Sequence, residues 1–242
     1  MTEHAIPIIA LDVRSGVEAL ALARSFGDAC RFFKVGSELF VAEGPSIVRQ
    51  LRDEVGADIF LDLKLHDIPN TVAGAVRSAR ALGVRLLTVH ASGGRAMLAA
   101  AHDAAGADCG VLGVTVLTSF DSVSLGRSWG REPLVVEDEV LRLAGDAAEA
   151  GLHGVVCSGA EAAAVARAYG ERLALLVPGI RLPGGEAHDQ RRIVTPRAAQ
   201  SAGARYLILG RAVTAAADPR AAMAEVLAEL SSDSFPGVRE RE

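Results

Sequence analysis

The sequence has few of the residues that build disulfide, metal or nucleic-acid sites. Only three of its 242 residues are cysteines, and Cys30, Cys109 and Cys157 lie far apart without CxxC or zinc-ligand spacing. We therefore expect reduced, buried thiols in a cytoplasmic protein. Aromatic residues make up 4% of the chain and form no stacking platform for bases. The 25 basic residues are outnumbered by 30 acidic ones, so nothing favours binding to nucleic acid.

Long hydrophobic runs are absent as well. The N-terminal stretch MTEHAIPIIALD has no basic segment, and its apolar run is far too short for export or for spanning a bilayer. We expect no membrane association and a cytoplasmic location. The six histidines show neither HxH nor HExxH spacing, so no metal site is predicted from them. Half of the residues are nonetheless hydrophobic, which is enough to bury a sizeable core.

Short apolar runs recur at regular intervals along the chain. Eight of them are typical of buried strands, at 6–12, 30–36, 58–64, 85–91, 109–117, 151–158, 172–180 and 204–210. Ala-rich segments with helical spacing lie between them, for example at 15–28, 71–83 and 94–106.

This alternation predicts the fold class. Eight β-α units in this length are typical of a (β/α)8 TIM barrel, whereas an open doubly wound sheet more often has fewer strands and a Gly-rich first turn, which LDVRSG lacks. We predict an α/β fold with a single TIM-barrel domain over residues 1–242. The barrel would occupy about 4–230, followed by a polar C-terminal tail at 231–242.

Charged residues fall at the predicted C-terminal ends of the strands, where barrel active sites lie. Asp12 ends the first strand, Lys34 the second, and Asp62 and Lys64 the third, with Asp67 just beyond. Since side chains at i and i+2 share one face of a strand, we expect Asp62 and Lys64 to point into the barrel mouth together. The alternative is a salt bridge that only neutralises a strand end. Asp12 and Lys34 weigh against it, because apolar residues would serve stability better there.

Such an array has a chemical consequence. Two carboxylates about 4 Å apart repel by roughly 4 kcal/mol at an effective dielectric near 20, and a lysine between them offsets much of that cost. The lysine stays charged and can donate a proton, whereas a carboxylate beside the substrate opposes negative charge already there. The sequence therefore predicts a site that favours the loss of an anionic group from its substrate.

The later strands indicate a phosphate site. Barrels often hold a phosphate between the loops that follow strands seven and eight. Arg181, Gln190, Gly210 and Arg211 lie in those two places, and we predict that they bind it.

These motifs resemble the orotidine 5′-phosphate decarboxylase family. DLKLHDIPNTV is similar to the family's DxKxxD signature, PGIRLPGGEAHDQRRIVTP to its phosphate loop, and ILGRAVT to its strand-eight phosphate turn. The resemblance covers most of the chain, from IALD to GRAVT. It implies decarboxylation of orotidine 5′-monophosphate to UMP and CO2 in pyrimidine biosynthesis, by a homodimer that uses no metal or organic cofactor.

The resemblance also implies a role for each matching residue. Lys64 would protonate C6 of the pyrimidine as CO2 leaves, within a charge network of Lys34, Asp62, Lys64 and Asp67. Asp67 and Thr71 would be contributed by the partner subunit. The remaining contacts would be Asp12 and Lys34 to the ribose hydroxyls, Thr118 to the pyrimidine amide, Pro178 at the ring end of the phosphate loop, and Arg181, Gln190 and Arg211 to the phosphate.

Some positions depart from the family pattern. Leu65 replaces a more usual aromatic residue and Ala212 replaces a common proline. The connection at 118–134 is longer than in compact relatives, so Ser119 is a second candidate beside Thr118. None of these changes removes a charged participant.

Two other functions stay open at this point. A related barrel with the same signature, such as a magnesium-dependent keto-acid phosphate decarboxylase or a hexulose-phosphate synthase, would bind metal through a signature carboxylate. A noncatalytic nucleotide-binding barrel would tolerate a broken charge array, yet every member is present here. The roles of His66, expected to be structural, and of His90, a candidate pocket residue, are also left open, as are the contacts of the 118–134 and 181–196 loops.

Overall fold

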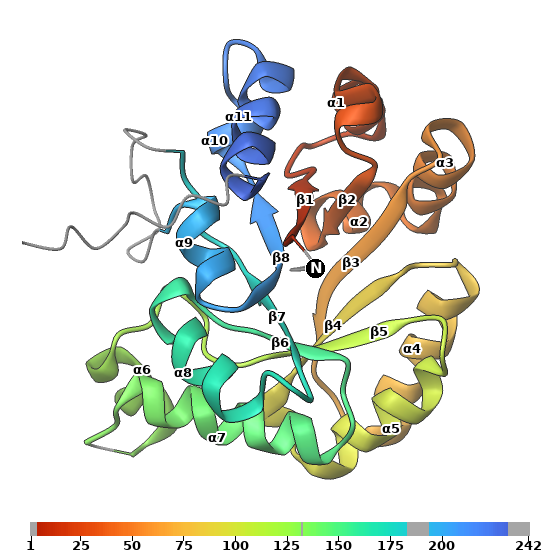
Figure 1. Cartoon of the computed structure of the whole chain (residues 1–242). Coiled ribbons are helices and arrows are strands. Elements are labelled where there is room, and N and C mark those ends of the chain that lie inside the picture. Colours follow the sequence, from red (N-terminus) through yellow and green to blue (C-terminus); the bar gives the residue numbers. More distant parts are fainter. Residues whose placement is uncertain (1–3, 132, 183–193, 232–242) are drawn as a thin grey trace, which may run out of the picture.

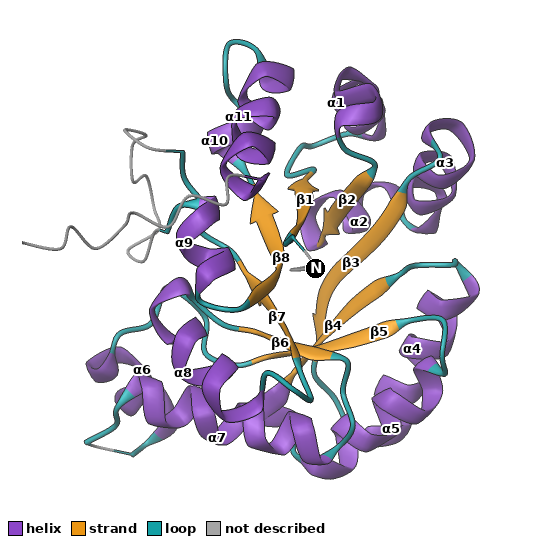
Figure 2. Ribbon diagram, in the orientation of Figure 1, coloured by secondary structure: helices purple, strands orange, loops and turns teal. Residues whose placement is uncertain are grey.

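The apolar runs form eight strands in a computed structural model, which describes residues 4–131, 133–182 and 194–231. The strands are parallel and close into a barrel in chain order, with β8 paired to β1 (Figures 1 and 2). Their bounds are β1 (Ile6–Ala10), β2 (Phe32–Gly36), β3 (Asp58–Leu65), β4 (Leu86–His90), β5 (Gly110–Val114), β6 (Gly154–Val156), β7 (Ala174–Val177) and β8 (Ala204–Leu209). The predicted (β/α)8 TIM barrel is confirmed, and each of the eight predicted runs holds one strand.

Helices cover the outside of the barrel (Figure 2). The α-helices are α1 (Gly16–Phe26), α2 (Ser37–Glu43), α3 (Pro45–Val55), α4 (Pro69–Ala81), α5 (Arg95–Ala105), α6 (Ser122–Trp129), α7 (Val136–Glu149), α8 (Gly159–Tyr169), α9 (Pro196–Ser201), α10 (Arg211–Thr214) and α11 (Pro219–Ser231), and short 3-10 turns occupy Gly27–Ala29 and Ala91–Gly93. The three helical segments named from the sequence correspond to α1, α4 and α5. The predicted tail at 231–242 lies outside the described residues except for Ser231, where α11 ends.

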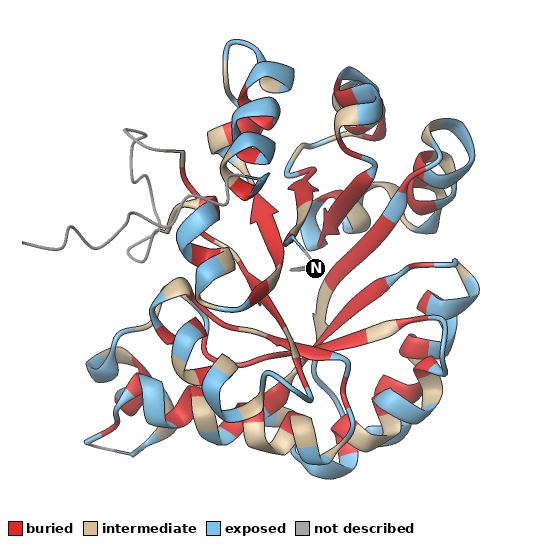
Figure 3. Cartoon of the chain, in the orientation of Figure 1, coloured by how far each residue is buried: buried red, intermediate tan, exposed pale blue. Residues whose placement is uncertain are grey.

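The core has two layers because each strand is buried on both faces. Along β1, Ile8 and Ala10 pack inside the barrel, whereas Ile9 and Leu11 pack against the surrounding helices. Figure 3 shows the result, with buried strands enclosed by helices whose outer faces are exposed. Burial on both faces is why the strands are continuous apolar runs in the sequence.

The three cysteines lie in this core. Cys30, Cys109 and Cys157 are buried and form no disulfide. Burial raises the pKa of the Cys109 thiol to about 11 and that of Cys157 to about 12, so both are protonated and poorly reactive at neutral pH. Within the described parts of the chain, no helix is both long and apolar enough to cross a bilayer.

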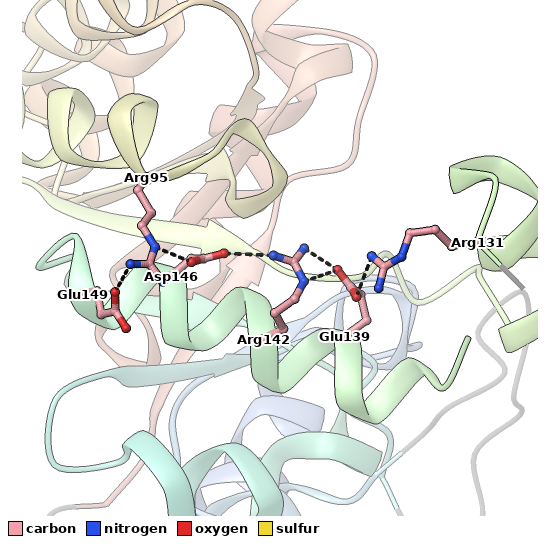
Figure 4. Close-up of polar contacts among 6 residues, drawn as sticks. All are labelled: Arg95, Arg131, Glu139, Arg142, Asp146 and Glu149. Carbon is pink, nitrogen blue, oxygen red and sulfur yellow. Dashed lines mark hydrogen bonds and ion pairs between the residues drawn. The ribbon is translucent and has the colours of Figure 1, made fainter. Parts of the chain in front are cut away.

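A chain of ion pairs runs along α7 and ties it to its neighbours (Figure 4). We call it the α7 ion network, and its members in order are Glu149, Arg95, Asp146, Arg142, Glu139 and Arg131. Arg95 reaches it from α5, and Arg131 from the segment that follows α6. The network therefore joins three parts of the outer layer through alternating charges.

Candidate active site

The C-terminal ends of the strands surround a cavity of about 230 Å³. Four charged side chains line it: Asp12 follows β1, Lys34 is on β2, and Asp62 and Lys64 are on β3. The other lining residues are Phe60, Val114, Val116, Leu117, Thr118, Val156, Cys157, Leu176, Pro178 and Ile208. The cavity thus combines an apolar wall with a small charged group, which is typical of a ligand site.

The four charged side chains alternate in sign across the mouth. Nζ of Lys34 donates a 2.8 Å hydrogen bond to Oδ1 of Asp12 and lies 3.9 Å from Oδ2 of Asp62. Nζ of Lys64 donates to the same Oδ2 of Asp62 at 2.7 Å. The Lys34 and Asp62 side chains are only 11% and 12% exposed, so their attraction is weakly screened by solvent. We call Asp12, Lys34, Asp62 and Lys64 the mouth array.

Gly36 leaves room for one end of this array. A Cβ atom at that position would lie 3.0 Å from Nζ of Lys34 and 3.5 Å from Oδ1 of Asp12. Any larger residue would therefore press on the ion pair at the point where β2 ends. No motif in the sequence marks Gly36 for this role.

The backbone at Lys64 is unusual. Its φ is 51°, and no other non-glycine residue in the described chain has a positive φ. The pairing of β3 with β4 also shifts register between Leu61 and Leu65. The expectation that residues i and i+2 of a strand share one face therefore does not hold strictly for Asp62 and Lys64. The two side chains still meet, but the backbone of Lys64 is in the left-handed conformation and not in that of a regular strand.

Asp67 and Thr71 follow the end of β3 and are exposed to solvent. Every residue from 66 to 71 is exposed, and the Asp67 carboxylate accepts a 2.6 Å hydrogen bond from the N–H of Ile68. Within the described part of the chain, Asp67 makes no ion pair. Asp67 therefore does not join the mouth array of its own chain.

Two predicted phosphate residues lie close to each other beyond β7 and β8. Arg181 is buried, and its pKa is lowered first by burial and then by the positive charge of Arg211. Gly210 directly precedes Arg211, at the start of α10. Two guanidinium groups that repel each other can bind an anion together. Gln190 lies outside the described residues.

The two ends of the 181–196 loop are joined. The N–H of Arg181 donates to the carbonyl of Val194 at 3.0 Å, and the N–H of Val194 donates to the carbonyl of Gly179 at 3.3 Å. This parallel bridge between Ile180 and Val194 lies close in sequence to Pro178, which lines the cavity. Most of the loop, from 183 to 193, is outside the described residues.

The two histidines near the DxKxxD signature, His66 and His90, lie next to each other. The rings of His66 and His90 lie 5.3 Å apart. Burial lowers the pKa of His90, and the charges of His66 and Lys64 lower it further against the opposing effect of Asp62. His90 is therefore neutral at physiological pH, and it is not among the residues that line the cavity.

Ser119 is exposed beside Thr118 and does not line the cavity either.

A larger hollow of about 590 Å³ lies at the opposite end of the barrel, beside the starts of β7 and β8. His153, Arg172, Arg205 and Tyr206 are among its lining residues, and none of the mouth array reaches it. The site is therefore assigned to the smaller cavity, where the charged groups converge. In the described residues, no group of three or more His, Cys, Asp or Glu side chains is arranged to hold a metal ion.

The closed parallel barrel and the lysine–carboxylate array at its C-terminal mouth place this chain in the class of TIM-barrel enzymes. Residues 6–226 match the model of the "Orotidine 5'-phosphate decarboxylase / HUMPS family", and the chain belongs to this family.

Individual relatives are similar to this chain over nearly its whole length. The orotidine 5′-phosphate decarboxylase of Halorhodospira halophila is 47% identical over 228 residues, which cover 93% of this chain and 95% of the relative. That of Dichelobacter nodosus is 48% identical over 231 residues, covering 94% and 99%. The crystal structure of orotidine 5′-phosphate decarboxylase from Lactobacillus acidophilus superimposes with a TM-score of 0.84 at 34% identity, covering 95% of this chain and 100% of that one.

Proposed function

We propose that this chain is a carboxy-lyase that converts orotidine 5′-monophosphate to UMP and CO2 in pyrimidine biosynthesis, with Lys64 as the proton donor. The observation that carries the proposal is the order of charges in the mouth array, where Lys64 donates to a buried Asp62 beside the cavity. Membership of the family and the relatives' names support the choice of substrate.

The array favours the loss of CO2 through electrostatics. A substrate carboxylate next to Asp62 is repelled, and this repulsion disappears when the C6–carboxylate bond breaks. The electron pair of that bond stays on C6, where the Lys64 ammonium stabilises the developing negative charge. A proton then passes from Nζ of Lys64 to C6 to form UMP, and the neutral amine regains a proton from water.

The rest of the site holds the nucleotide in place. Arg181 and Arg211, with Gly210 and Gln190, bind the phosphate, whose negative charge offsets the repulsion between the two guanidinium groups. Asp12, Lys34, Thr118 and Pro178 line the cavity. In the proposed complex Asp12 and Lys34 bind the ribose hydroxyls, Thr118 binds the pyrimidine amide, and Pro178 lies at the ring end of the phosphate loop. Binding energy from the phosphate thereby contributes to the chemistry at a distant carbon.

The proposed enzyme is a cytoplasmic homodimer in which Asp67 and Thr71 complete the partner's site. The segment 66–71 supports this arrangement, because it is exposed throughout and carries Ile68, a large apolar side chain that is 67% exposed. Mixing inactive Lys64→Ala subunits with inactive Asp67→Asn subunits should restore up to about a quarter of the turnover per site, because a heterodimer then has one intact site. The same mixture with no recovered turnover would contradict the shared site.

The decisive assay follows CO2 release and UMP formation from orotidine 5′-monophosphate in excess EDTA. We expect full turnover, because no step of the proposed chemistry requires a metal. Turnover that EDTA abolishes and Mg²⁺ restores would favour a metal-dependent member of the family. Tight binding of UMP without any release of CO2 would instead favour a noncatalytic nucleotide-binding barrel.

A further inference from the structure

One buried hydroxyl contacts both Asp62 and Lys64. Thr88 lies on β4 and has no exposed surface. Its Oγ1 donates a 2.8 Å hydrogen bond to Oδ1 of Asp62 and accepts a 2.9 Å hydrogen bond from the backbone N–H of Lys64. Thr88 does not line the cavity, so it acts on the site only through these two residues.

The first contact fixes the rotation of the Asp62 carboxylate. With Oδ1 held by Thr88, Oδ2 is left to face both lysines, at 2.7 Å from Nζ of Lys64 and 3.9 Å from Nζ of Lys34. A hydroxyl has a single proton, so a Thr88 that donates to Asp62 is free to accept from an N–H. The two hydrogen bonds are therefore compatible and set each other's direction.

The second contact holds a strained backbone. Lys64 has a positive φ, which an unbranched L-residue adopts only where its surroundings hold it there. The register shift between Leu61 and Leu65 interrupts the regular β3–β4 ladder, and the Thr88 side chain supplies an acceptor for the Lys64 N–H within that interruption. A valine would fill the same space without this acceptor.

We propose that Thr88 is a positioning residue whose hydroxyl locks the Asp62 carboxylate and the left-handed backbone of Lys64 in one arrangement. This aims Nζ of Lys64 at the reacting carbon while Asp62 faces the substrate carboxylate. The proposal rests on the proposed function for its catalytic consequence, but the geometric lock itself is independent of the substrate.

The test compares Thr88→Val, Thr88→Ser and the control Thr115→Val. Thr115 is also buried, and its hydroxyl donates a 2.8 Å hydrogen bond to the carbonyl of Val156 rather than to a member of the mouth array. We expect Thr88→Val to lower kcat by about 10- to 100-fold with KM changed less than about threefold, because misplaced groups cost turnover rather than recognition. Thr88→Ser and Thr115→Val should stay within about threefold of the parent kcat.

A second readout needs no substrate. Amide hydrogen exchange at Lys64 should be about tenfold faster in Thr88→Val than in Thr115→Val, because the N–H has lost its acceptor. Unchanged exchange at Lys64 would overturn the proposed role of Thr88, whether or not the parent is active. Failure of the parent to decarboxylate orotidine 5′-monophosphate would count against the proposed function alone. Equal kcat in Thr88→Val and Thr115→Val, or an equal loss in the serine and valine variants, would also overturn it. If Thr88→Val does not fold, Thr88→Cys, a poor hydrogen-bonding substitute of similar size, is judged by the same criteria.

Discussion

Asp62 and Glu139 are both buried carboxylates held between two cations, yet only one of them lies in the candidate site. Asp62 in the mouth array is flanked by Lys34 and Lys64, and its side chain is 12% exposed. Glu139 in the α7 ion network is flanked by Arg131 and Arg142, and its side chain is 4% exposed (Figure 4). Burial and alternating charge therefore do not by themselves distinguish an active site from a structural network.

Three other properties separate the two regions. The cations of the mouth array are lysines, which can give up a proton, whereas the arginines beside Glu139 stay protonated at any physiological pH. The mouth array borders a cavity, whereas the α7 ion network joins packed helices and a loop. The chain also adopts a left-handed backbone at Lys64, but Glu139 lies in a regular helix. A transferable proton, space for a ligand and a strained backbone together indicate chemistry.

Replacing Lys64, the proposed proton donor, should have the largest effect on turnover. Lys64→Ala, and Lys64→Arg with its charge kept, should each lower kcat by at least about 10³-fold, because both lose the proton donor at C6. Affinity for UMP should persist in Lys64→Ala, since proton donation belongs to the transition state. The measurements are turnover of orotidine 5′-monophosphate and titration with UMP.

The matched control replaces an arginine by a lysine in the α7 ion network, the reverse of Lys64→Arg. Arg142→Lys keeps a cation beside Glu139 and should leave kcat within about twofold of the parent. Turnover by Lys64→Arg at the level of Arg142→Lys would show that the proton comes from another group, and the distinction between the two regions would then fail.

The sequence was sufficient to predict the barrel and the members of the mouth array. Parallel strands buried on both faces are continuous apolar runs, and the topology of a barrel brings their charged ends together whatever the details of each strand. The sequence alone therefore predicts that Asp12, Lys34, Asp62 and Lys64 lie at one mouth of the barrel.

The supporting residues could not be predicted in the same way. Thr88 in LLTVH is an ordinary strand residue in the sequence, and its two hydrogen bonds depend on a register shift that has no sequence signal. The positive φ of Lys64 is equally hidden, because glycine, asparagine and aspartate are the usual residues there. In the α7 ion network, helical spacing predicts the contact of Glu139 with Arg142 but not the arrival of Arg131 from another segment.

A smaller effect is expected on stability from the carboxylate of the α7 ion network. Glu139→Gln leaves Arg131 and Arg142 without their buried partner, and it should lower the free energy of unfolding by about 2 kcal/mol. This is below the usual cost of breaking a fully buried pair, because both arginines are about half exposed and regain water. Urea unfolding measures the loss, and kcat per folded molecule should be unchanged.

The exposed end of the same network supplies the control and the smallest effect. Arg95 pairs with Asp146 and Glu149, but its side chain is 65% exposed, so Arg95→Ala should cost less stability than Glu139→Gln does. Raising the salt concentration to about 1 M shortens the screening length to about 3 Å and should remove most of that cost. The loss in Glu139→Gln should persist in the same salt, because its carboxylate is shielded from solvent. If salt removed both losses equally, Glu139 would behave as a surface charge, and its burial could no longer be compared with that of Asp62.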